Sequence, residues 1–173
     1  MECISVFDML KIGVGPSSSH TLGPWRAAER FIGELLQKKA FNSITHVQVE
    51  VYGSLSLTGK GHATDLAIML GLTGADPVTI PIENISGIIK GIQDSKKLLL
   101  NNSLEIPFDP KVDILFKREF LPFHANGLTF TATLSNGKQI QETYYSIGGG
   151  FVVKEELKRS KKKLEVFKAF PFP

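Results

Sequence analysis

Apolar side chains recur every three or four residues along much of the first half of the chain, which is the spacing of one helix face. The longest such stripe predicts a helix over residues 24–39, with Pro24 in the first turn, where a missing N–H costs nothing. Shorter stripes predict helices over residues 5–10, 65–72 and 85–92, the last with Asn84 as its N-cap. The stripe of the longest helix consists of Ala28, Phe31, Ile32, Leu35 and Leu36.

Strict alternation of apolar and polar residues marks the predicted strands. Residues 44–53 place valines on one face and polar side chains on the other, so we expect a half-buried strand with His46 facing solvent. Helical patterns come early and strands late, which favours an α+β fold over a strict βαβ repeat. The later strands are predicted over residues 111–120, 128–134 and 138–147, and Ser135-Asn136-Gly137 joins the last two as a hairpin.

Composition limits the classes of protein that remain. A chain of 173 residues suits one domain, and its net charge of +3 is small. The basic excess lies mainly in residues 154–163, which we expect to be a solvated helix face or a tether, so no nucleic-acid partner is predicted. The amino terminus has neither a basic segment nor a long apolar core, so we expect a cytoplasmic protein with no membrane partner. Cys3 is the single cysteine, and alone it holds neither a disulfide nor a metal, so no metal site is expected in this chain.

The loop over residues 13–20 concentrates glycines, hydroxyls and an imidazole just before the longest helix. Ser17, Ser18 and Ser19 would place hydroxyl and N–H groups at the positive end of that helix, where a carboxylate or phosphate binds well. His20 adds a group that exchanges protons near neutral pH. The alternative is that the serines only cap the helix and His20 packs against it.

A second loop, "TGKGHATD", repeats this composition at the start of another helix. It offers Lys60, His62 and Thr64, and the alternative for Thr64 is that it serves only as the helix N-cap. A third element, "LPFHANG", carries His124 and Asn126 on a turn before a strand, and its alternative is a plain surface turn.

A fourth element, "YYSIGGGF", has three consecutive glycines after a strand, which suggests close approach of two backbone segments. These four segments have a similar composition, in which glycines, hydroxyls and imidazoles recur. We therefore expect the loops of residues 13–20, 59–65 and 124–127 to converge on one open face, with His20 near His62.

These segments closely resemble the β domain of the bacterial iron–sulfur L-serine dehydratases. The resemblance rests on "SVFDMLKIGVGPSSSHTLGPWRAA", "GSLSLTGKGHATDLAIMLGL", "FHANGLTF" and "YYSIGGGF", in that order. It implies a mixed, largely antiparallel sheet packed by helices, similar to the allosteric substrate-binding domain of phosphoglycerate dehydrogenases. Residues 1–153 would form the β domain and residues 154–173 a basic linker towards an α domain.

The resemblance also implies an activity. Such enzymes convert L-serine to pyruvate and ammonia in amino-acid catabolism and gluconeogenesis, with a [4Fe–4S] cluster acting on the serine hydroxyl. The cluster is bound by cysteines of an α domain or subunit, so it would not be carried by this chain, which would be one half of an enzyme and inactive alone. A homodimer is among the oligomeric states left open.

Roles for single residues follow from the same resemblance. His62 matches the general base, His20 a partner that positions the substrate, and Thr64 a residue that orients His62 or the substrate. Ser17, Ser18, Ser19, Lys60, His124 and Asn126 would bind the substrate. The competing hypothesis is a regulatory module of the same fold that senses a small anion without chemistry, for which Arg26 and Lys60 would be the cationic ligands.

Overall fold

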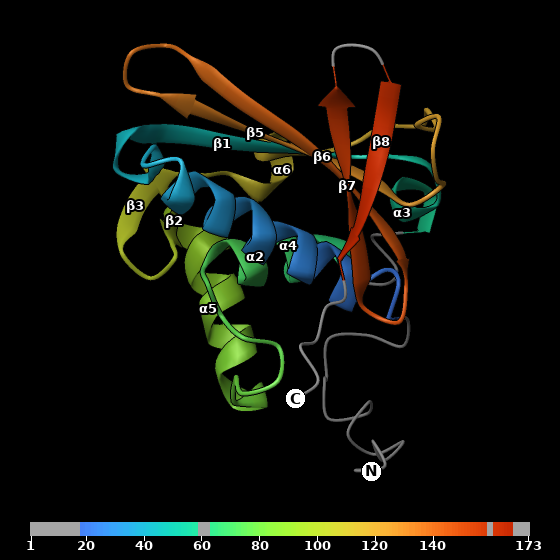
Figure 1. Cartoon of the computed structure of the whole chain (residues 1–173). Helices are drawn as coiled ribbons and strands as arrows, with labels where there is room; N and C mark the ends of the chain where they lie inside the picture. The colour runs from blue at the N-terminus through green and yellow to red at the C-terminus, as the bar shows by residue number, and fades with distance from the viewer. Residues whose placement is uncertain (1–17, 59–62, 159–160, 168–173) are drawn as a thin grey trace, which may run out of the picture.

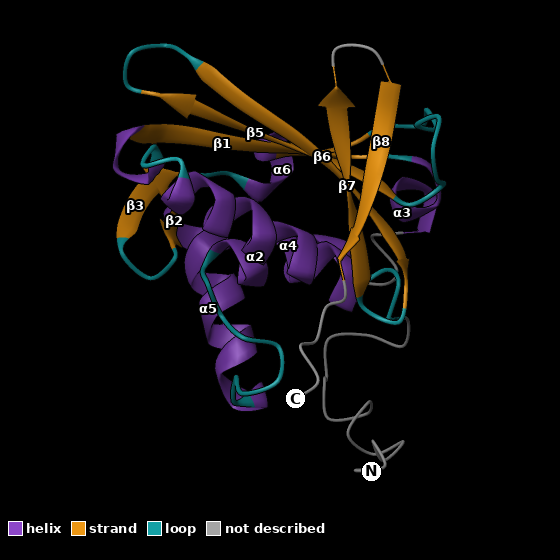
Figure 2. Cartoon of the chain, in the orientation of Figure 1, coloured by secondary structure: helices purple, strands orange, loops and turns teal. Residues whose placement is uncertain are grey.

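The computed structural model describes residues 18–58, 63–158 and 161–167 of the chain, and from residue 157 onward it describes the backbone alone. Its centre is a six-stranded sheet whose one face is covered by helices (Figure 1, Figure 2). The sheet order is β4 (Ile114–Phe116), β1 (Ile44–Val51), β5 (Gly127–Leu134), β6 (Gln139–Gly148), β7 (Phe151–Lys158) and β8 (Lys161–Phe167). Among the described strands of this sheet only the β1–β4 pair is parallel, so the predicted α+β class with a mixed, largely antiparallel sheet is confirmed.

Strand β1 shows the alternation that its sequence predicted. Val47, Val49 and Val51 are fully buried, because alternate side chains of a strand point to the same face. His46 lies on the other face, where its side chain is 40% exposed and its Nε2 is 2.8 Å from Asp113 Oδ1. The imidazole therefore faces solvent only in part, because it also pairs with the segment before β4.

The longest helix, α2 (Leu22–Gln37), lies across the covered face of the sheet (Figure 1). Its predicted stripe is buried except for Leu36, which is 45% exposed. Phe31 of this helix stacks on Phe130 of β5, with ring centroids 5.1 Å apart. The pattern thus identified the helix and the face by which it packs.

Helix α4 (Thr64–Leu72) packs directly on α2 through a glycine. A Cβ atom on Gly71 would lie 2.4 Å from the carbonyl oxygen of Trp25 and 2.7 Å from the Cβ of Ala28. Only glycine permits this separation of the two helix backbones. Trp25 is fully buried and donates its indole N–H to the carbonyl oxygen of Ala75 at 2.7 Å, which connects α2 to the segment after α4.

Helix α5 (Ile82–Ser95) was predicted from its isoleucines, but its start was not. The N-cap is Pro81 in an extended conformation, and Asn84 lies inside the first turn, with its N–H donating to the Pro81 carbonyl at 3.0 Å. The prediction of Asn84 as N-cap is therefore wrong. The reason is that the fixed backbone of Pro81 already sets the helix start.

Several short elements escaped the sequence analysis. The strand expected over residues 111–120 shrinks to β4, because Asp109 accepts the N–H of Lys111 and begins a helical turn ahead of it. The missed elements are the 3-10 helix η1 (Phe41–Ser43), α3 (Gly53–Thr58), α6 (Pro110–Asp113) and the two-stranded sheet of β2 (Lys97–Leu100) and β3 (Leu104–Pro107). With at most six residues each, they are too short to show a clear period.

The described residues of the basic run, 154–158 and 161–163, are strand and not helix. They belong to β7 and β8, in which Val153 pairs with Val166 and Lys158 with Lys161, so the expectation of a solvated helix face is wrong for them. Strand β7 also pairs with β6, which makes both strands part of the central sheet. The division into a domain over residues 1–153 and a linker over 154–173 stays a prediction. No helix in the described part of the chain has the length and apolar character needed to cross a membrane.

Candidate functional site

The described part of the opening loop, residues 18–21, forms a turn held between α2 and the end of β6 (Figure 1). The N–H of Gly23 donates to the Ser18 carbonyl at 2.9 Å, and the hydroxyl of the fully buried Ser146 donates to the Ser19 carbonyl at 2.7 Å. The N-cap of α2 is Thr21, so neither Ser18 nor Ser19 is the N-cap, although the Ser18 carbonyl accepts one N–H of the first turn. The turn is held by the strand behind it.

Thr64 holds the same turn from a third direction. Its hydroxyl donates to the carbonyl oxygen of His20 at 2.7 Å, and the residue is fully buried. The N-cap of α4 is Ala63, in a left-handed conformation, and not Thr64. The capping alternative is therefore wrong, because the first residue of α4 turns its hydroxyl toward the neighbouring loop.

The imidazole of His20 is half-buried and lies between two hydroxyl groups. Its Nδ1 is 2.9 Å from Ser19 Oγ, and its Nε2 is 3.3 Å from Ser54 Oγ at the start of α3. Ser54 was not singled out from the sequence. It lies in the motif "GSLSLTGKGHATDLAIMLGL", directly after Gly53, which has a φ of +56° and begins a short helix.

The third loop reaches the same strand residue as the first. The Nδ2 of Asn126 donates to the Ser146 carbonyl at 3.2 Å, and the Ser146 N–H donates to the Asn126 carbonyl at 2.9 Å. His124 turns back on its own loop, where its Nδ1 accepts the N–H of Asn126 at 3.1 Å. Ser146 therefore links the turn of Ser19 to the turn of Asn126. In the sequence, the segment "YYSIGGGF" stood out for its three glycines and not for this serine.

Gly148, Gly149 and Gly150 complete this end of the sheet as the β6–β7 turn. All three have positive φ, at 97°, 60° and 77°. A Cβ on Gly150 would lie 2.6 Å from Cδ2 of Leu22, the first residue of α2. The expected close approach is thus between the turn and the start of α2, beside the opening loop.

The structure therefore brings together Ser18, Ser19, His20, Thr64, His124 and Asn126 at one end of the sheet. Ser17, Lys60 and His62 lie outside the described residues, so the expected proximity of His20 and His62 stays a prediction. Arg26, a proposed ligand of the sensor hypothesis, has its guanidinium 2.9 Å from the carboxylate of Glu29.

Two phenols near these loops do not exchange protons at neutral pH. Burial, with a hydrogen bond to Glu50, raises the pKa of Tyr52 to about 12. Burial and the hydrogen bond to Glu155 also raise the pKa of Tyr145 well above its usual range. Imidazoles are the side chains whose ordinary pKa suits proton transfer at neutral pH.

Exposed apolar side chains gather around the same loops. Phe120 is 59% exposed and lies against the start of α3, where its ring would be 2.9 Å from a Cβ on Gly53. Phe123 is 46% exposed and packs edge-on against Tyr145 of β6, with centroids 5.0 Å apart. Leu57 of α3 and Ile147 of β6 are exposed too, and we call these four residues the apolar rim.

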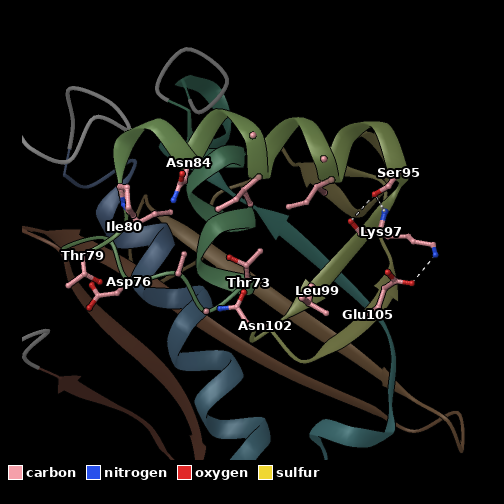
Figure 3. Close-up of a pocket in the computed structure, with 17 residues that line it drawn as sticks. Thr73, Asp76, Thr79, Ile80, Asn84, Ser95, Lys97, Leu99, Asn102 and Glu105 are labelled. Carbon is pink, nitrogen blue, oxygen red and sulfur yellow. Dashed lines mark hydrogen bonds and ion pairs between the residues drawn. The ribbon is translucent and has the colours of Figure 1, made fainter.

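A cavity of about 700 Å³ lies elsewhere, between α5, the β2–β3 hairpin and the segment after α4 (Figure 3). Its charged lining residues already have partners. Lys97 pairs with Glu105 at 2.8 Å, and Asp76 accepts the N–H of Val78 at 2.8 Å. None of the candidate site residues in the described structure lines it, so the candidate chemistry belongs to the loops at the sheet end.

Comparison with known proteins identifies the family of the chain. Residues 5–157 match the family model described as serine dehydratase beta chain. The chain belongs to this family. An L-serine dehydratase of Haemophilus influenzae is 48% identical over 154 residues, which are 88% of this chain and 34% of that protein.

Two further relatives of this serine dehydratase beta chain extend the comparison. L-serine dehydratase 1 of Escherichia coli is 45% identical over 98% of this chain and 37% of its own length. An L-serine dehydratase of Helicobacter pylori is 41% identical over 90% of this chain and 34% of its own length. The chain thus spans about a third of the length of the curated relatives that it matches.

Proposed function

We propose that this serine dehydratase beta chain forms the substrate-binding wall of an enzyme that converts L-serine to pyruvate and ammonia. The observation that carries the proposal is the meeting of three loops, distant in sequence, around His20. Their contacts run from Thr64 to the His20 carbonyl and from Ser146 to both Ser19 and Asn126. The names of the relatives supply the reaction.

The start of α2 suits the carboxylate of the substrate. Sixteen residues of helix place partial positive charge at this end, next to the hydroxyl-rich turn. We assign the carboxylate to Ser17, Ser18 and Ser19, and substrate positioning to His20. Lys60, His124 and Asn126 complete the binding set in this proposal.

The side chain of Asn126 has a hydrogen-bond acceptor left unused by the described residues. Its Oδ1 is buried and has no hydrogen-bond partner among the described residues, while its Nδ2 is used by Ser146. A buried acceptor without a donor is unfavourable by about 1–3 kcal/mol. The ammonium group of L-serine is a donor that would remove this penalty.

We assign removal of the α-proton of L-serine to His62, which acts as the general base. A neutral imidazole takes the proton from the α-carbon, a proton is delivered to the β-hydroxyl so that it leaves as water, and hydrolysis of the resulting enamine gives pyruvate and ammonia. His62 precedes Thr64 by two residues, which span at most about 7 Å. Thr64 contacts the carbonyl of His20, so this chain distance supports a shared site.

This chain does not itself fit the [4Fe–4S] cluster that the resemblance implies. A cluster of this type needs at least three thiolates, and the sequence has only Cys3. We therefore place the cluster in an α domain or subunit, within the two-thirds of the relatives' length that this chain does not match. We propose that this α part covers the apolar rim and that the chain alone is inactive.

The sensor hypothesis has less support. Arg26 is engaged by Glu29, and the other charge it invoked, Lys60, lies outside the described residues. A cytoplasmic location and a likeness to the regulatory domain of phosphoglycerate dehydrogenases remain expectations.

The test is His62→Ala in the enzyme with its α part present. We expect kcat to fall by about 10²–10⁴ with a smaller change in KM, because the lost group acts in the transition state. The control is His46→Gln, a histidine paired with Asp113 on the outer face of β1, which should keep nearly normal kcat. Cluster content is measured for each variant. Normal kcat in His62→Ala with activity lost in His20→Ala would reverse the two roles, and normal kcat in both would favour the sensor.

Two further measurements separate binding from chemistry. Alanine at Ser18 should mainly raise KM, by a factor of about 5–100, because its hydroxyl binds the carboxylate equally in ground and transition states. Ser19→Ala should raise KM too, and it should also lower kcat because it removes the contact with Nδ1 of His20. The purified chain alone should form no pyruvate from L-serine. Pyruvate formation by the chain alone would show that the α part is not needed.

A further inference from the structure

We propose that Ser54 is a positioning residue for His20: its hydroxyl holds Nε2 of the imidazole and sets the orientation in which the ring meets the substrate. The inference deepens the proposed function and rests on it, since His20 matters to the reaction only if the substrate binds at these loops. The contact itself is independent of any activity.

The ring of His20 is held at both nitrogens. Ser19 Oγ lies 2.9 Å from Nδ1 and Ser54 Oγ lies 3.3 Å from Nε2. Turning the ring by 180° would replace each nitrogen by a carbon and remove both contacts. Two hydroxyls on opposite sides therefore select one of the two ring orientations.

A hydroxyl is suited to this task in either tautomer of the imidazole. It can donate to a bare ring nitrogen or accept from a ring N–H, because it carries one proton and two lone pairs. Ser54 can thus keep its contact when the proton moves from one ring nitrogen to the other. A carboxylate at the same place would favour the charged imidazole, whereas a hydroxyl leaves the proton free to move.

The position of Ser54 is fixed by its backbone. Three consecutive N–H groups, from Tyr52, Gly53 and Ser54, donate to the carbonyls of Gly127, Glu119 and Ala125 at 2.9, 2.9 and 2.8 Å. These acceptors flank or belong to the loop of His124 and Asn126.

At Gly53 these hydrogen bonds leave no room for a side chain. Its φ is +56°, and a Cβ there would lie 2.3 Å from the Ala125 carbonyl oxygen. The serine after it therefore cannot shift without moving the third loop. Ser54 couples that loop to the imidazole of the first loop, which is the arrangement expected of a residue that positions another.

The first test reads the ring of His20 by nitrogen-15 NMR on the chain labelled at histidine. The sequence has four histidines, and His20→Asn identifies the signal of His20. Ser54→Ala should move the Nε2 resonance of His20 and leave the signals of His46 unchanged. Ser54→Thr keeps a hydroxyl and should restore the resonance.

The matched control is Ser56→Ala on the same short helix. Ser56 is two residues further along α3, about 200° around the helix axis from Ser54, so its side chain points another way. It should leave the resonances of His20 unchanged. Because the bonds that hold Ser54 come from its backbone N–H and carbonyl, alanine leaves them in place and the fold should persist.

The second test measures turnover of L-serine by the enzyme with its α part. Ser54→Ala should lower kcat/KM by about 3- to 10-fold, the loss expected for one neutral hydrogen bond, and Ser54→Thr should recover it. An unchanged His20 spectrum in Ser54→Ala would overturn the contact. A changed spectrum with unchanged kcat/KM would overturn the positioning role.

The two failures are distinguishable from failure of the proposed function. If His62→Ala and His20→Ala both keep normal turnover, the site assignment is wrong, while the NMR result on Ser54 still stands. If those variants lose activity and Ser54→Ala does not, only the role of Ser54 is wrong.

Discussion

Replacing Gly23 with alanine tests whether the candidate site depends on the close contact between α2 and β6. The new Cβ would lie 1.9 Å from Ser146 Oγ and 2.6 Å from Ser146 Cβ, far inside van der Waals contact. Ser146 is fully buried, so its side chain has no solvent to turn into. The clash is relieved partly by movement of the helix away from the strand and partly by loss of the Ser146 bond to the Ser19 carbonyl, so both costs contribute.

The magnitude follows from these two costs and one gain. Overpacking a tight contact costs about 1–3 kcal/mol, and loss of a buried hydrogen bond costs about 1–3 kcal/mol more. Alanine returns at most about 1 kcal/mol through its higher helix propensity. We therefore expect Gly23→Ala to lower the free energy of unfolding by about 1–5 kcal/mol.

Gly33 provides the same substitution on the same helix without the contact. No atom lies within 4 Å of a Cβ at Gly33, so Gly33→Ala should raise the free energy of unfolding by about 0.5–1 kcal/mol. Urea unfolding followed by the fluorescence of Trp25, the only tryptophan and fully buried, measures both variants. With a slope of about 2 kcal/mol per M, a loss of 2 kcal/mol moves the midpoint by about 1 M.

Equal stability of Gly23→Ala and Gly33→Ala would refute this reasoning. A double-mutant cycle gives a second check. In a Ser146→Gly background the nearest atom of residue 146 to the new Cβ becomes its Cα at 3.6 Å, so Gly23→Ala should then cost much less. A cost that is unchanged in this background would mean that the strain lies elsewhere.

Two further predictions concern hydrogen bonds and charge. Thr64→Val should lower the free energy of unfolding by about 1–3 kcal/mol in urea, because the buried hydroxyl that serves the His20 carbonyl is lost, whereas Thr64→Ser should cost less. Burial alone would raise the pKa of Glu142, but hydrogen bonds from Lys38 and Lys154 hold it below its usual value. A carboxylate with a lowered folded-state pKa stabilises the protein above its unfolded-state pKa, and this contribution is lost as pH falls through the folded-state value. Urea unfolding from pH 6 down to pH 3 should therefore show a steeper loss of stability in the native protein than in Glu142→Gln, and equal slopes would contradict the assignment.

Local pattern was enough for the elements whose period spans many residues. Helix α2 and strands β1, β5 and β6 were predicted because burial on one face imposes a repeat that consecutive residues display. The hairpin turn was equally local, since Gly137 has the positive φ that the turn requires. The basic run failed as a helix because its described residues form strands that pair with one another across the β7–β8 hairpin, while Lys154 pairs with Tyr144 of β6, and neither pairing leaves a local period in the sequence.

The family and the chemical groups of the candidate site could be assigned from the sequence alone, because its motifs keep hydroxyls, imidazoles and glycines in a specific order. Tertiary structure decided which groups meet. The contact of Ser54 with His20 joins residues 34 positions apart, and that of Ser146 with Ser19 joins residues 127 positions apart. Thr64 is a further example. Its local sequence favours an N-cap role, but its hydroxyl instead bonds a loop 44 residues earlier in the chain. Such bonds form only when packing of α2 on the sheet and of α4 on α2 has brought the loops together, so no period along the chain predicts them.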